Sequence, residues 1–169
     1  MLFLLSTPEY NKLQSNTTKI KVHLRNGIAE ILEQHQDLMG RVENNLLEIE
    51  TNFENKLEKF LYVLQDAVFI VSTKGLEANI DSKGTRVYVY AKRVREINST
   101  TSIDEIGKQV EIKTLELDKE LEKESEKSKQ SSNEGSKKTD LILNSRILLL
   151  KDEVEFLKRV IAIVKGLKG

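Results

Sequence analysis

The sequence predicts an α+β protein in which an N-terminal antiparallel β-sandwich is followed by a C-terminal two-helix hairpin. Before about residue 100, apolar residues alternate with polar ones, as on half-buried strands. After it, apolar residues recur every three or four positions, as on one side of a helix. The length of 169 residues suits one or two domains with a modest core. We therefore expect a β-sandwich domain over residues 1–97 and a helical hairpin domain over residues 98–169.

Short alternating segments separated by turn-forming residues fill the first part. Ile20, Val22 and Leu24 show the pattern most clearly, because they are interleaved with basic side chains. Asn44 precedes another such segment, and asparagine tolerates the left-handed backbone that a tight turn requires. Many short strands favour a sandwich or a flattened barrel. The expected strands are residues 2–6, 19–25, 28–32, 46–50, 60–64, 67–72 and 87–94.

The second part predicts helices over about residues 103–124 and 140–166. Ser102 ends a polar linker and is a good N-cap for the first helix. Residues 125–139 are rich in Ser, Lys, Glu and Gly, so we expect a solvated polar connector between the two helices.

The last predicted helix has apolar residues at alternating spacings of four and three, which form a heptad seam. The seam consists of Leu143, Ile147, Leu150, Val154, Leu157, Ile161 and Val164. Such a seam is typical of the inner face of a two-helix hairpin, but it also suits a coiled coil with a partner. Leu148, Leu149, Phe156, Val160 and Ile163 widen the stripe and keep the second interpretation open.

The composition argues against several functional classes. The chain has no cysteine, and its 27 basic residues balance its 27 acidic ones, so no overall charge would attract nucleic acid. No apolar run approaches the ~20 residues of a membrane-spanning helix, and residues 1–5 resemble a first strand. His23 and His35 lack partners at metal-ligand spacing, and acidic pairs such as Glu120 and Glu124 suit a solvated helix face. We expect no catalytic residue, no cofactor, no metal and no membrane insertion.

Ordered segments of the chain match a known family. Thr7-Pro8 ends the first expected strand, and Asn26-Gly27, Ile31-Leu32, His35 and Leu38 match the pattern D-G-E-I-G-I-L-P-G-H-A-P-L. Residues 44–49 fall where the family has P-G-V-L-R-I, residues 87–91 match V-T-V-L-A, and residues 103–104 open a helix. Over about residues 1–125 the chain thus resembles the epsilon subunit of the F-type ATP synthase, called delta in mitochondria.

The resemblance implies a non-catalytic central-stalk (rotor) subunit that couples or regulates rotary ATP hydrolysis and synthesis. Its sandwich would bind the gamma subunit and the membrane rotor ring, and its hairpin would reach the catalytic head. The protein would be cytoplasmic and peripheral to the membrane through the complex. The ring-facing loop would include Gly27, Ile28, Glu33 and His35. The partner-binding residues of the helical arm would be Leu150, Val154, Leu157, Lys158, Arg159 and Ile161.

The chain also departs from the family pattern. Gly107-Lys108 stands where some bacterial members have the Arg-Ala of an ATP-binding signature, so we expect no ATP binding. Ile28 and Glu30 replace a glutamate and a glycine of the ring-facing loop, and Glu33 and Asp37 replace its prolines. These changes favour one alternative, the equivalent subunit of a specialised F-type-like motor without proton transport. A second alternative is a free-standing coiled-coil adaptor, which predicts a stable homodimer.

Overall fold

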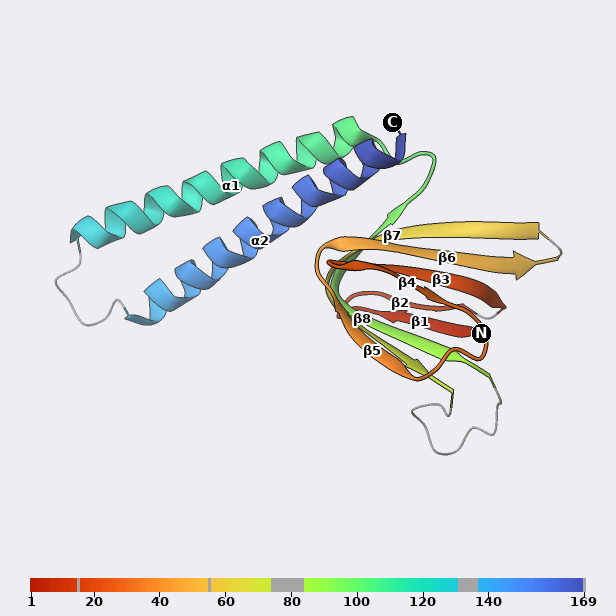
Figure 1. Cartoon of the computed structure of the whole chain (residues 1–169). Coiled ribbons are helices and arrows are strands. Elements are labelled where there is room, and N and C mark those ends of the chain that lie inside the picture. Colours follow the sequence, from red (N-terminus) through yellow and green to blue (C-terminus); the bar gives the residue numbers. More distant parts are fainter. Residues whose placement is uncertain (15, 55, 74–83, 131–136, 169) are drawn as a thin grey trace. The chain divides into compact units, whose positions relative to one another are not determined.

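A computed structural model describes residues 1–14, 16–54, 56–73, 84–130 and 137–168 of the chain. The chain divides into two compact units, Met1–Thr101 and Ser102–Gly169 (Figure 1). The first unit is built of β-strands and the second of two α-helices. The predicted fold class, an N-terminal β-structure followed by a two-helix hairpin, is confirmed.

The strands of the first unit form one hydrogen-bonded sheet. Its order is β2-β1-β8-β7-β6-β3-β4, and β5 also pairs with β7. All of these pairs are antiparallel except β1 with β8, which is parallel. The strands are β1 (Leu2–Ser6), β2 (Asn11–Gln14), β3 (Thr17–Leu24), β4 (Gly27–Ile31), β5 (Leu38–Val42), β6 (Asn45–Phe53), β7 (Lys56–Ser72) and β8 (Arg86–Ile97).

A corner in the longest strands folds this sheet into a sandwich. Strands β5 and β6 follow one another along β7, with Val42 opposite Ala67 and Asn45 opposite Leu64. Between these pairs, Asn44 and Asp66 have φ angles of 34° and 45°. Such left-handed residues bend the two-stranded ribbon, and Asn and Asp tolerate this backbone best among non-glycine residues. The left-handed preference expected at Asn44 is confirmed, whereas the expected strands 60–64 and 67–72 are a single strand.

Both layers of the sandwich contribute to one hydrophobic core. In Figure 1, β6 and β3 lie across this core from β5. Gly40 of β5 has no side chain, and a Cβ atom there would clash with the ring of Phe69 on β7. The buried core residues are Phe3, Leu5, Ile20, Val22, Ile31, Val42, Leu47, Ile49, Tyr62, Leu64, Ala67, Phe69, Val71, Val87, Val89 and Ala91.

The second unit contains helices α1 (Ile103–Gln130) and α2 (Lys137–Lys168). Ser102 is the N-cap of α1, as predicted, because its Oγ accepts a hydrogen bond of 3.3 Å from the backbone N–H of Glu105. The polar connector predicted over residues 125–139 is wrong for most of its length, since both helices extend into it. Lysine and glutamate are good helix formers, so a polar segment can continue a helix without an apolar face. Residues 131–136 lie outside the described part of the chain.

Burial on α2 follows the heptad seam. Six of the seven seam residues are buried, and Ile161 is half-buried. Ion pairs join the described parts of the helices: Lys113 Nζ lies 3.6 Å from Glu153 Oε2, and Arg146 Nε lies 3.5 Å from Glu120 Oε1. The solvated position expected for Glu120 is wrong, because Glu120 is buried beside Arg146. Leu148 and Leu149 are exposed. Within the described residues, neither helix is long and apolar enough to cross a membrane.

Candidate interaction surfaces

One outer surface of the sandwich is apolar although it faces away from the core. The strand registers place Met39 beside Ile70, Ile70 beside Tyr88, and Tyr88 beside Leu4. This row crosses four strands, β5, β7, β8 and β1. A second row places Val68 beside Tyr90. We call these residues the apolar face; it consists of Leu4, Met39, Val68, Ile70, Tyr88 and Tyr90.

Several members of the apolar face are open to solvent. Met39 is 69% exposed, Tyr90 44% and Val68 39%. Next to them, Arg41 Nη2 lies 3.4 Å from Asp66 Oδ1, in an exposed ion pair at the corner of the sheet. Exposed aromatic residues and methionine that adjoin one another on a rigid sheet are typical of protein-binding surfaces.

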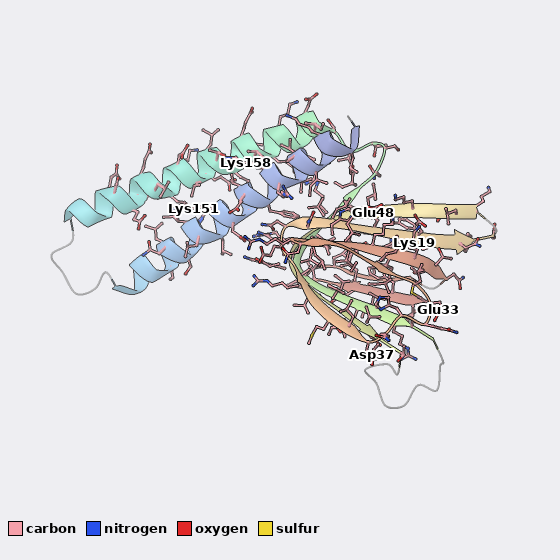
Figure 2. All side chains as sticks on the ribbon, viewed as in Figure 1. Lys19, Glu33, Asp37, Glu48, Lys151 and Lys158 are labelled. Carbon is pink, nitrogen blue, oxygen red and sulfur yellow. The ribbon has the colours of Figure 1, made fainter. Side chains whose placement is uncertain are left out.

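The outer surface of the other layer carries paired charges instead. Its lysine–glutamate ion pairs join β3, β4, β6 and β7, and Lys19 and Glu48 mark it in Figure 2. We call it the charged face. Its contacts are Lys19 Nζ to Glu50 Oε2 (3.0 Å), Lys21 Nζ to Glu30 Oε2 (3.5 Å), His23 Nε2 to Glu48 Oε1 (2.7 Å) and Lys59 Nζ to Glu48 Oε2 (2.6 Å).

Glu48 is the central acid of the charged face, because each of its carboxylate oxygens meets a different partner. Burial by itself raises the pKa of Glu48, but hydrogen bonds from Lys59 and His23 outweigh burial. The net result is a pKa below the usual value for glutamate. Glu48 therefore stays ionised and binds its neighbours within the sheet.

The predicted ring-facing residues do not form one cluster. Gly27 and Ile28 begin β4, whereas Glu33 and His35 follow its other end. At about 3.3 Å per residue, β4 places its last residue, Ile31, about 13 Å from Gly27 and about 10 Å from Ile28. Ile28 is exposed, and His35 Nδ1 lies 2.7 Å from the carbonyl oxygen of Gln36. Whether these residues contact a partner stays a prediction.

Two acids of the loop after β4 bind other parts of this chain. Glu33 Oε1 accepts a hydrogen bond of 2.7 Å from the backbone N–H of Thr85, and Glu33 Oε2 lies 2.9 Å from the ammonium group of Met1. Asp37 Oδ1 accepts hydrogen bonds from the backbone N–H and the hydroxyl of Thr73, at 2.8 and 3.0 Å. Figure 2 shows both acids at the same end of the sheet. The hydrogen bond from Thr85 is the main reason why the pKa of Glu33 lies below its usual value.

The predicted residues of the helical arm fall into two groups. Leu150, Val154 and Leu157 are buried in the seam, and Ile161 is half-buried. Lys158 and Arg159 are exposed, and Figure 2 shows Lys158 on the same helix as Lys151. Within the predicted set, the exposed residues are therefore the two basic ones.

Sequence reasoning missed a part-buried polar contact of the core residue Tyr62 and the whole of the apolar face. The hydroxyl of Tyr62 accepts a hydrogen bond from Lys12, whose Nζ also lies 4.0 Å from the centroid of the Phe60 ring. Burial raises the pKa of Tyr62.

Residues 67–71 and 87–91 were the available signal for the apolar face, since apolar side chains at consecutive positions give a strand two apolar faces. Among the described residues, no group of three potential metal ligands is present.

Comparisons with known proteins identify the fold. No protein-family model and no curated protein matches the chain. A chain in the cryo-EM structure of the Euglena gracilis mitochondrial ATP synthase, OSCP/F1/c-ring in rotational state 1, matches with a TM-score of 0.54 and 14% identity. The match covers 96% of this chain and 79% of that chain.

A chain in the cryo-EM structure of the Tetrahymena thermophila mitochondrial ATP synthase, central stalk/c-ring, matches with a TM-score of 0.42 and 14% identity. This match covers 63% of this chain and 69% of that chain. The protein therefore shares its fold, over nearly its whole length, with a chain of the Euglena mitochondrial ATP synthase complex.

Proposed function

We propose that the protein is a non-catalytic central-stalk (rotor) subunit of an F-type ATP synthase or ATPase, and that its sandwich binds the gamma subunit. The apolar face is the observation that carries this proposal. A folded domain rarely leaves methionine, valine and tyrosine side chains adjacent and open on a sheet unless another protein covers them. The family resemblance in the sequence and the shared fold support the choice of assembly.

The composition of the apolar face suits a permanent contact within an assembly. Tyrosine and methionine are enriched in protein interfaces, and a few such residues usually carry most of the binding energy. The exposed ion pair of Arg41 and Asp66 lies at the edge of this surface, where a polar rim costs little. Binding through a rigid sheet also avoids the entropy cost of ordering a loop.

The other parts of the proposal concern the hairpin and the membrane side of the complex. The exposed basic residues Lys158 and Arg159 suit contacts with acidic segments of the catalytic head. The subunit would reach the membrane only through the complex. Because its ring-facing loop differs from the family pattern, any contact with the rotor ring would use residues particular to this chain.

One observation favours a second candidate, the equivalent subunit of an F-type-like motor without proton transport. Glu33 and Asp37, which replace prolines of the family loop, bind Thr85 and Thr73 of this same chain. A loop reorganised in this way would present a different surface to a ring. The subunits that co-purify with the tagged protein distinguish the two motors.

Co-expression of the full chain with the gamma subunit from the same organism tests the proposal. We expect a stable one-to-one complex by size-exclusion chromatography with light scattering, and no ATP hydrolysis by the protein alone. A stable homodimer that fails to bind gamma would contradict the proposal and would favour the adaptor alternative.

A further inference from the structure

Strand β5 is an open edge beside the apolar face. It pairs with β7 on one side. Within the described residues, no backbone hydrogen bond joins residues 38–42 to any strand on the other side. The outward N–H and C=O groups of an edge strand form a row that another extended chain can pair with.

This edge also lacks the usual protection against pairing. Its register with β7 runs without a bulge from Leu38 to Val42, and it contains no proline. Its one charged residue, Arg41, is engaged by Asp66. Gly40 faces the core, where a Cβ atom would clash with the ring of Phe69, so this position places no side chain over the edge. Met39, the most exposed member of the apolar face, stands on this strand.

We propose that β5 is a docking edge for an extended segment of the partner, which adds to the sheet as a further strand. The inference rests on the proposed function, since the partner is the gamma subunit. An extended backbone is the occupant that the edge selects, because only a second strand satisfies a whole row of alternating N–H and C=O groups. Side chains alone could cover the apolar face but would leave this row to water.

The apolar row sets the chemistry of the added strand. Side chains of neighbouring strands lie beside one another on the same face, at about 4.8 Å spacing between strands. An apolar residue of the partner beside Met39 would therefore lengthen the row of Met39, Ile70, Tyr88 and Leu4 by one strand. A carboxylate two positions away on the partner strand would lie beside Arg41. About five residues of the partner would match the length of β5.

Hydrogen exchange with single-residue resolution tests strand addition directly. In the free full chain, the outward amides of residues 38–42 should exchange faster than those that face β7. In the complex with gamma, we expect the outward amides to slow by about 100-fold, corresponding to new backbone hydrogen bonds. If gamma binds and protects Val68 and Tyr90 while the outward β5 amides exchange as before, strand addition is wrong and the proposed function stands.

A matched pair of variants gives a second measurement. Met39→Lys and Leu57→Lys place the same charge at side chains that are each 69% exposed, so neither should disturb folding. Met39→Lys should weaken gamma binding by about tenfold or more, because a lysine on an edge strand opposes pairing. Leu57→Lys, on the hairpin of β6 and β7, should leave the affinity unchanged. Equal affinities of the two variants would overturn the proposal, and an unmodified chain that fails to bind gamma would instead overturn the proposed function.

Discussion

The two outer surfaces of the sandwich come from neighbouring parts of the same sheet and have opposite chemistry. On β3 and β6, residues that point away from the core are charged and paired, as with Lys19 and Glu50. On β7 and β8 the residues that point away from the core are Val68, Ile70 and Tyr90. The difference indicates which surface faces water and which needs a partner, because a solvated sheet face alternates with its core face in polarity and a covered one does not.

The comparison also separates stability from binding. Charges on the charged face satisfy one another within the chain, so their loss should lower the free energy of unfolding. Met39, Val68 and Tyr90 of the apolar face are exposed, so their loss should lower affinity instead. The following variants test this separation.

The largest expected effect lies outside both faces. Val154 is 6% exposed in the seam of α2, so Val154→Asp should cost about 3–5 kcal/mol if the charge stayed buried. We expect loss of helicity by circular dichroism, while the sandwich proposed over residues 1–97 stays folded and still binds gamma. Leu149→Asp, on the exposed side of the same helix, should change neither property. If Val154→Asp abolished gamma binding, the apolar face would not be the main interface.

Charging the centre of the apolar face should give the next largest effect. Val68→Lys combined with Tyr90→Lys should weaken gamma binding by about 100-fold, since truncated central residues of interfaces commonly cost 2 kcal/mol or more. Because both side chains are partly exposed, the melting temperature should change by only a few degrees. The charge-swapped pair Lys19→Glu with Glu50→Lys is the control and should bind normally. Calorimetric titration with gamma measures both affinities. Weak binding by the charge-swapped pair, together with normal binding by the Val68→Lys and Tyr90→Lys variant, would contradict this assignment of the two faces.

Breaking the charged face should lower stability without changing affinity. Glu48→Ala removes the carboxylate that both His23 and Lys59 contact, and should cost about 1–2 kcal/mol in urea unfolding. Glu30→Ala removes one exposed contact at 3.5 Å and should cost less than about 0.5 kcal/mol. Similar losses of stability for the two variants would mean that Glu48 is not the central acid of the charged face.

The smallest expected effect is a pH dependence. The pKa values of Glu33 and Glu48 are lowered in the folded chain relative to the usual value of 4.5. Their contribution to stability is therefore present above pH 4.5 and is lost as the pH falls through the lowered values. The double variant Glu33→Gln with Glu48→Gln should lose less stability than the unmodified chain between pH 6 and pH 3. An identical acid dependence, measured by thermal unfolding at each pH, would contradict the assignment.

Local patterns were enough wherever one element supplied its own periodicity. The alternation around Ile20 predicted β3, and the heptad from Leu143 to Val164 predicted the buried side of α2. Strand β5 could not be predicted in this way, because Gly40 and Arg41 interrupt its alternation and its extended state depends on pairing with β7. Strand β2 was missed for the same reason, since it pairs only with β1 among the described residues.

The sequence by itself determined the division of the chain into a β-strand part and a helical part, the N-cap at Ser102 and the seam of the hairpin. These features depend on residues a few positions apart. Only the tertiary structure decided which outer surface is apolar and which edge is open. Met39 and Tyr88 are far apart in the chain and share a row because β7 lies between their strands. Conversely, Gly27 and Glu33 are close in the chain but are separated by the length of β4. Strand register, which arises from pairing between distant segments, brings the first two residues into one row, and the extended backbone of β4 keeps the second two apart.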